Sequence, residues 1–282
     1  MLEFNGLVIA VLVLAVIAGL PHGAFDVYIA HRLGIWRTPL QLSMWLLRYL
    51  LFSAAVIGLW IIAPMLSLIV FLLISALHFG RDYFPTNHIM ATSLGLVILG
   101  LPMLGHGNTV ALIFSYLLLP MQHAEQLVWL FSILAIIAAV VLLAAAFIVA
   151  TGQVFGYSVA RWKLHPKTGL GKYGVFLVVL TVAAYIFHPL IYFALYFSLS
   201  HSPLHLREQW RAIAPAKRNA ALGVLTILTL VPVISAFLFG TTMAGAWSER
   251  VIALVFIGLA ALTMPHMLLL EKVYREKRRN YG

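Results

Sequence analysis

The stretch Phe197-Ser-Leu-Ser-His201-Ser-Pro-Leu-His205 ends a long apolar run that is rich in aromatic residues. Its two histidines are four positions apart, and positions i and i+4 lie on the same face of a helix. Two imidazoles on one helical face can point at one metal ion. Two further histidines, His22 and His78, stand at the ends of other apolar runs. We therefore expect these four histidines to meet at one metal site.

The composition of the whole chain indicates a membrane protein. Of its 282 residues, 63% are hydrophobic and only 9% are charged, whereas soluble domains carry about 25% charged residues. Several runs exceed the ~18 apolar residues that indicate a membrane-spanning helix, and the ten-residue alternation of membrane β-barrels is absent. We predict an all-α, polytopic transmembrane bundle of about 7–9 segments, forming a single integral-membrane domain over residues 1–282.

The apolar runs that carry this prediction are 5–30, 41–62, 65–80, 88–104, 126–150, 173–187, 189–206, 220–239 and 250–270. The stretch 109–119 is too short to span and is expected to lie in the interface or to re-enter. The first run lacks the basic residues and the cleavage site of a signal peptide, so we expect it to be retained.

The net charge of +10 is read as a membrane feature and not as a sign of nucleic-acid binding. The basic residues cluster between apolar runs, where they set topology and meet anionic lipid. The positive-inside rule then predicts an outside N-terminus and a cytoplasmic C-terminus, in a multi-pass protein of the cell (inner or plasma) membrane. Residues 173–206 would cross twice, with a break at His188-Pro189; a single long tilted helix is the alternative.

Only two aspartates occur in the chain, and each stands four residues after a proposed ligand, in His22-x-x-x-Asp26 and His78-x-x-x-Asp82. A carboxylate one turn from a metal-bound histidine can orient an imidazole, its own or a neighbour's. The plainer alternatives are a buried hydrogen bond to another helix for Asp26 and a salt bridge with Arg81 for Asp82.

Several other residues are expected to support the site or line a substrate channel. Gly23 allows close helix approach or leaves room for a substrate. Pro203, between the paired histidines, either kinks the helix or opens a new one with Ser202 as its cap. The remaining candidates are a fifth histidine near the end of the last helix and three aromatic residues, for which interfacial belts and core packing are the alternative: His266, Tyr192, Tyr196 and Phe197.

These motifs resemble the Brp/Blh family of bacterial and archaeal membrane enzymes. The resemblance rests on Pro21-His-Gly-Ala-Phe-Asp26, Ala76-Leu-His-Phe-Gly-Arg-Asp82, His201-Ser-Pro-Leu-His205 and Met264-Pro-His-Met267, in matching order and spacing. It implies cleavage of β-carotene by O₂ at the central double bond, giving two molecules of all-trans-retinal. It also implies an Fe(II) centre held by His22, His78, His201 and His205, a lipid-soluble substrate taken from the membrane, and an opsin as a product acceptor.

The sequence leaves two other functions open. A membrane di-iron desaturase or hydroxylase needs several histidine boxes, and this chain has one close pair. A metal or proton transporter would use histidine and aspartate as relay groups across the whole membrane depth, and here they gather at one level. The lysine positions argue strongly against a retinal-binding opsin, which needs a lysine inside the bundle. The six lysines all lie in loops or the tail: Lys163, Lys167, Lys172, Lys217, Lys272 and Lys277.

Overall fold

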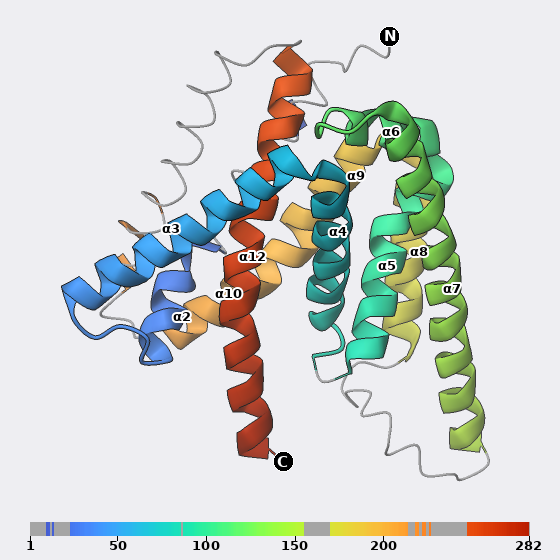
Figure 1. Ribbon diagram of the computed structural model, residues 1–282. Coiled ribbons are helices and arrows are strands. Elements are labelled where there is room, and N and C mark those ends of the chain that lie inside the picture. The colour runs from blue at the N-terminus through green and yellow to red at the C-terminus, as the bar shows by residue number, and fades with distance from the viewer. Residues whose placement is uncertain are drawn as a thin grey trace. The chain divides into compact units, whose positions relative to one another are not determined.

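Figure 1 shows the computed structural model, in which the described secondary structure is helical. The structure describes residues 23–85, 87–154, 170–213 and 247–281, together with positions 10, 11, 13, 218, 219, 222, 223 and 226. No strand occurs among these residues, which confirms the predicted all-helical class. The expected runs 5–30 and 220–239 fall largely outside the described residues.

Five helices within the described ranges are long and apolar enough to cross a membrane. This finding identifies a helical membrane protein, as predicted, while the total of about 7–9 segments and the orientation of the termini stay predictions. The five are α3 (Pro39–Ile62), α4 (Pro64–Arg81), α5 (His88–Gly105), α7 (Met121–Val154) and α12 (Trp247–Tyr281).

The start of α3 follows directly from its sequence. Thr38 is extended, and its hydroxyl accepts a hydrogen bond from the Gln41 backbone, while the Gln41 side chain accepts one from the Thr38 backbone. This reciprocal capping box satisfies backbone donors that a helix start leaves without partners. Pro39 occupies the first turn, where its missing N–H costs nothing.

Contacts among Cα atoms divide the chain into two compact units. The first comprises residues 1–67, 116–118 and 193–282. In it, α12 packs against α3 and against the short helix α2 (Asp26–Arg32). The Trp60 indole of α3 is fully buried and donates a hydrogen bond to the Leu117 carbonyl at 2.9 Å, so the segment 116–118 is held against α3.

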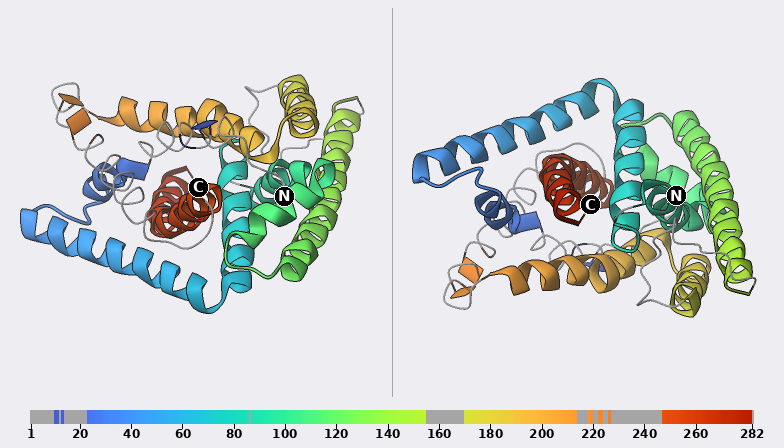
Figure 2. Two further views of the ribbon diagram at one scale, coloured as in Figure 1. Left: turned by 90° about the horizontal axis from the view of Figure 1, so that it is seen from above. Right: turned by 90° about the horizontal axis from the view of Figure 1, so that it is seen from below.

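The second unit comprises residues 68–115 and 119–192. Its centre is α5, which packs on α7 and on α8 (Leu170–Ile186), while the short α6 (Gly107–Ser115) packs on α7. Figure 1 and both views of Figure 2 show α5, α7 and α8 side by side. The α6 helix covers the first part of the 109–119 stretch. With nine residues it is too short to span a membrane, as predicted.

Two glycines let α4 and α5 approach until their backbones nearly touch. A Cβ atom built on Gly80 would lie 1.7 Å from the Ala91 carbonyl oxygen, and one built on Gly95 would lie 1.7 Å from the Ala76 carbonyl oxygen. The two contacts are reciprocal, one from each helix. Close approach of this kind is how membrane helices gain van der Waals contact without a hydrophobic driving force.

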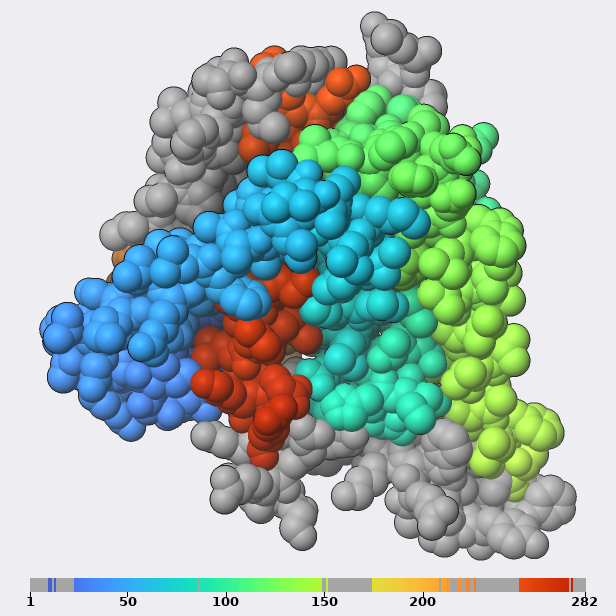
Figure 3. Space-filling view, viewed as in Figure 1, coloured from blue at the N-terminus to red at the C-terminus, as the bar shows by residue number. Residues whose placement is uncertain are grey.

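The α3 helix exposes most of its apolar side chains. Only 11% of its most apolar window is buried, and Figure 3 shows much of its surface (blue) on the visible face. Monomeric soluble proteins rarely expose so large a contiguous apolar surface, so contact with lipid is its physical explanation. The exposed large residues are Leu40, Met44, Leu47, Leu50, Leu51, Phe52, Ile57, Leu59, Ile61 and Ile62.

The break predicted at His188-Pro189 is present. The α8 helix ends at Ile186, and α9 (Pro189–Leu195) begins at the proline. The His188 carbonyl accepts hydrogen bonds from the backbone of Ile191 and Tyr192, at 2.8 and 2.9 Å, as at the start of a helix. The number of crossings made by residues 173–206 stays a prediction.

Two helices run further than their apolar runs predict. The α7 helix begins at Met121 instead of near residue 126, and α12 continues through Tyr281 instead of ending near residue 270. Hydropathy marks only the part of a helix that lipid can surround. Glutamate, lysine, arginine and glutamine are good helix formers, so a helix can continue through polar residues beyond that part.

Because α4 and α5 approach so closely, we predict that even a methyl group at one of these glycines lowers the stability of the protein. We expect Gly95→Ala to destabilise the protein by about 1–3 kcal/mol, because the added methyl group overlaps the Ala76 backbone. Thermal melting of detergent-purified protein measures this change. Gly58→Ala in α3 is the matched control, since none of the described atoms lies within 4 Å of a Cβ built there. Equal melting temperatures for the two variants would contradict the close approach.

The turn before α9 predicts a dependence of stability on pH. Burial, and then the charge of nearby His106, lowers the pKa of His188 below its ordinary 6.5. The unfolded chain therefore binds the proton more tightly, and the contribution of His188 to stability is complete above about pH 6.5 and declines below it. We expect His188→Gln to reduce the loss of melting temperature between about pH 7.5 and pH 5.5. His123→Gln, at an exposed position of α7, should leave that loss unchanged.

Candidate metal centre

The helix that carries the paired histidines changes its winding just before Pro203. The segments α9, η2 (Tyr196–His201) and α10 (Ser202–Ala212) follow one another directly, and η2 is a π-helix in which the Ser202 N–H bonds to the Phe197 carbonyl five residues earlier. In an ordinary α-helix, the ring of Pro203 would collide with the Leu199 carbonyl. The wider π turn gives the chain room at that point, and such turns are frequent at functional sites.

The prediction for Pro203 is confirmed in part. The proline lies in the first turn of α10, as one alternative proposed, but Ser202 as the cap is wrong. The cap position is His201, with helical φ −68 and ψ −59 and no side-chain cap hydrogen bond. The chain stays helical through the junction, so the extended residue that a capping side chain requires is missing.

Two aromatic rings from the π segment stack on the His201 imidazole. Tyr196 stacks on the His201 imidazole with ring centroids 6.4 Å apart and an interplanar angle of 22°, and Phe197 does so at 5.6 Å and 24°. These neighbours are five and four positions earlier, whereas an α-helix brings together positions three and four apart. Both aromatic residues are buried, so the predicted neighbours of the site do lie beside His201.

His201 and His205 themselves are close and buried. Their ring centroids are 4.8 Å apart at an interplanar angle of 59°, and the residues are 1% and 7% exposed. Imidazoles placed so deep in an apolar interior are costly unless other groups satisfy them. A shared cation would satisfy both rings at once.

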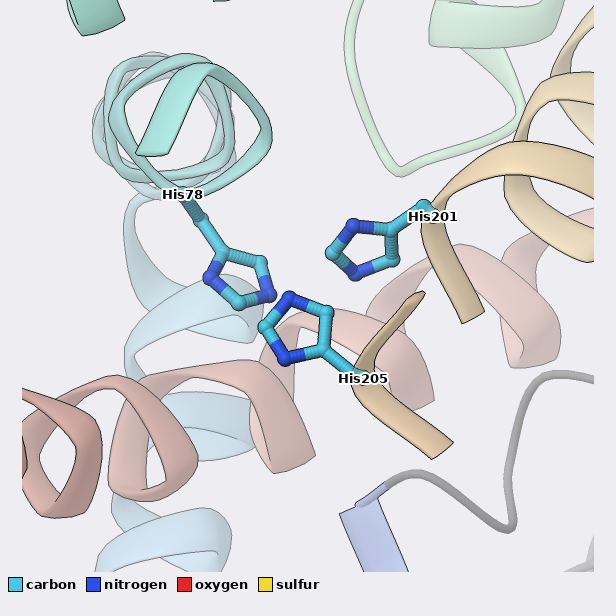
Figure 4. A group of neighbouring side chains, drawn as sticks. All are labelled: His78, His201 and His205. Carbon is cyan, nitrogen blue, oxygen red and sulfur yellow. The ribbon is translucent and has the colours of Figure 1, made fainter. Parts of the chain in front are cut away.

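His78 of α4 offers a third nitrogen. One ring nitrogen from each of His78, His201 and His205 lies within 4.8 Å of the other two, and Figure 4 shows the three rings turned toward one another. Three nitrogens that bind one divalent metal at about 2.1 Å can all be at most about 3.6 Å from one another, so the three rings would have to move closer to hold one ion. Neutral imidazole suits iron, zinc, copper or nickel.

Asp26 joins the site through His266. The Asp26 Oδ1 atom lies 2.7 Å from His266 Nδ1, and Asp26 Oδ2 accepts a hydrogen bond from the Tyr49 hydroxyl at 2.9 Å. The His266 ring in turn contacts the His205 ring, with centroids 6.5 Å apart at 75°. Of the alternatives for Asp26, the buried hydrogen bond to another helix is present, and the orientation of a metal-site imidazole stays a prediction.

The remaining predicted residues are placed as follows. His22 lies outside the described residues. None of the described atoms lies within 4 Å of a Cβ built on Gly23. Asp82 is half-buried, and the Arg81 guanidinium lies against His88 Nδ1 at 3.1 Å. The buried Tyr192 hydroxyl donates to the Ile98 carbonyl at 2.8 Å, so Tyr192 anchors α9 to α5.

Tyr49 is the residue of this network that the sequence analysis missed. It stands in the middle of the apolar run 41–62, next to Arg48, where hydropathy shows only a membrane helix. The one signal was a phenol in the interior of that run, because a buried tyrosine hydroxyl generally finds a hydrogen-bond partner.

The described helices are those of a helical membrane protein, and its three buried histidines form a group that could hold a metal ion. The family model described as Beta-carotene 15,15'-dioxygenase matches residues 13–274. A protein named beta-carotene 15,15'-dioxygenase, from uncultured marine bacterium 66A03, is 30% identical over 277 residues, which is 94% of this chain and 93% of that protein. No solved structure matches the chain.

The chain therefore belongs to the beta-carotene 15,15'-dioxygenase family, which is a family of enzymes. The resemblance stated from the sequence motifs is confirmed. The match begins within the first expected run, 5–30, and extends past the last, 250–270. The resemblance itself rested on four short motifs that are widely separated in the chain.

The π turn predicts that Pro203 is needed for the orientation of the paired histidines. Pro203→Ala restores a backbone donor and removes the ring, so we expect the segment to relax toward an α-helix and metal binding to weaken about 10–100-fold, as for other supports of a ligand. Titration of the metal-free protein with Co²⁺ measures the affinity. Pro39→Ala, in the first turn of α3, is the matched control, and equal affinities would refute the prediction.

Proposed function

We propose that this protein cleaves β-carotene at its central double bond with O₂ and gives two molecules of all-trans-retinal, in a reaction that depends on Fe(II). The observation that carries the proposal is the group of buried imidazoles at His78, His201 and His205 in a chain of this family. The central double bond is broken, and each of its two carbons gains one oxygen atom. The atoms of one β-carotene and one O₂ balance those of two retinals, so no reductant is needed.

In this proposal His22, His78, His201 and His205 hold the metal. The three described members are neutral nitrogen donors, so they bring no charge of their own into the membrane interior. Their neutrality would leave a bound ion cationic. Positions that the histidines do not fill would stay open to other ligands. Iron, when bound, would supply the redox-active centre at which O₂ is activated.

The protein's own residues do the remaining work of binding, orientation and exclusion of water. Tyr196 and Phe197 stack on His201 and restrict its ring, and we propose that they also line the channel for the polyene. Tyr192, Gly23, Asp82 and His266 belong to the same proposed lining or support. Because His78, His201 and His205 are almost fully buried, water would be kept from the reacting double bond. The exclusion of water limits side reactions.

The substrate and the product point to the membrane as the medium. β-Carotene dissolves in the bilayer, and apolar surfaces such as those of α3 and α7 face outward, so we propose that the substrate enters from lipid. Retinal would leave by the same route, and an opsin is the proposed acceptor. We further propose one catalytic domain over residues 1–282, in a multi-pass protein of the inner or plasma membrane with an outside N-terminus and a cytoplasmic C-terminus.

Alanine substitutions in β-carotene-producing cells test the function. We expect His22→Ala, His78→Ala, His201→Ala and His205→Ala each to lower retinal by at least about 100-fold, since loss of groups that merely support a metal ligand already costs 10–100-fold. β-Carotene should accumulate in these cells. Chromatography of extracted pigments measures both compounds.

His123→Ala is the matched control, because His123 is exposed on α7 and should leave retinal production unchanged. Normal retinal in the His201→Ala or His205→Ala strain would refute the metal-site assignment. Metal analysis of an active preparation that finds no iron would refute the Fe(II) assignment alone.

A further inference from the structure

The Asp26 carboxylate joins three helices of the first unit. It begins α2 and is 2% exposed. One of its oxygens is 2.7 Å from His266 of α12, and the other accepts the Tyr49 hydroxyl of α3 at 2.9 Å. The same hydroxyl lies 3.2 Å from the Leu262 carbonyl of α12. The hydroxyl has one proton, and the shorter distance shows that Asp26 is its main acceptor.

This arrangement selects one tautomer of His266. A carboxylate oxygen can only accept a hydrogen bond, so Nδ1, the His266 nitrogen that faces it, carries a proton. The other ring nitrogen, Nε2, is then on the side of the ring that faces away from Asp26. A carboxylate that holds a histidine by one nitrogen is the usual support around metal sites, where it fixes both the tautomer and the plane of the ring.

The position of His266 indicates support of the site and not direct ligation. It is absent from the three histidines whose nitrogens lie within 4.8 Å of one another. Its ring instead meets that of His205 nearly edge-on, at 6.5 Å and 75°. A ring fixed by Asp26 restricts the rotation of the His205 ring against which it packs.

We propose that Tyr49, Asp26 and His266 form a chain of positioning residues that holds the His205 imidazole in the orientation needed to bind metal. The inference rests on the proposed function, because it takes His205 as a metal ligand. Tyr49 aligns the Asp26 carboxylate, Asp26 fixes the tautomer and plane of His266, and His266 packs on His205. Each residue comes from a different helix, so the chain also sets the rotation of α2, α3 and α12 about their own axes.

Co²⁺ binding to the metal-free, detergent-purified full-length protein tests the proposal without any measurement of activity. We expect Tyr49→Phe to weaken Co²⁺ binding about 10–100-fold and to change the ligand-field absorption of the bound ion, as loss of an outer support does. Tyr28→Phe is the matched control. It removes the same hydroxyl group two residues after Asp26, where the ring packs on the cluster of Ala24, Phe25 and Ile213, and should leave affinity and spectrum unchanged.

A second variant serves if Tyr49→Phe fails to fold. His266→Gln keeps a side-chain N–H that can donate to Asp26 but removes the ring that packs on His205. We expect the melting temperature of the metal-free protein to be retained while Co²⁺ affinity falls. Wild-type affinity and spectrum in this variant, or in a folded Tyr49→Phe, would overturn the positioning role. A lowered melting temperature with unchanged affinity would do so as well.

His205→Ala separates this inference from the proposed function. If His205→Ala loses Co²⁺ binding while folded Tyr49→Phe and His266→Gln retain it, the positioning chain is wrong and the metal site stands. If His205→Ala binds Co²⁺ like the wild type, the proposed metal site itself is wrong, and the positioning chain is overturned with it.

Discussion

A buried carboxylate in an apolar interior must find its hydrogen-bond donors within the protein, because lipid provides none. Asp26 meets this constraint with one donor from α3 and one from α12. Hydrophobic contact sets helix rotation poorly in a membrane, since lipid tails are as apolar as leucine. Directional hydrogen bonds are specific where apolar contact is not, so the Asp26 network fixes which faces of α2, α3 and α12 meet. The approach of His266 to His205 depends on that choice.

Pro203, which lies between the two histidines, constrains the backbone next to His201. Pro203 cannot fit an ordinary α-helix at its position, and the preceding turn widens into the π segment Tyr196–His201. The widened turn brings Tyr196, five positions earlier, onto the face of His201, where its ring stacks beside that of Phe197. The backbone constraint at Pro203 therefore affects which side chains surround His201. Pro203 and both histidines belong to the same short stretch of sequence.

Family membership and geometry contribute different parts of the functional conclusion. The family match over residues 13–274 identifies an enzyme, and the structure adds three imidazoles that are almost fully shielded from solvent. Shielding suits a reaction on a hydrocarbon that dissolves only in the bilayer. The exposed apolar faces of α3 and α7 place the same protein in contact with that bilayer. Both observations support the lipid-soluble substrate that we propose.

The sequence by itself determined the helical membrane class, most of the spans, the break before Pro189 and the pairing of His201 with His205. These features are local: hydropathy is a property of a single run, and a separation of four residues decides which side chains share a helical face. It also singled out Asp26 and His266 as polar groups within apolar runs. It missed the extent of α7 and α12, because polar residues past the lipid boundary leave no hydropathy signal while still forming helix.

Only the tertiary structure decided which groups meet. The partner of Asp26 is His266, 240 positions away, and the second donor is Tyr49, which a hydropathy profile cannot separate from its apolar neighbours. The π turn likewise depends on how the chain accommodates Pro203, and the sequence left a kink and a new helix equally open. The physical reason is common to these cases. Pairing between helices depends on the rotation of each helix about its axis, and that rotation is set by directional contacts between distant residues.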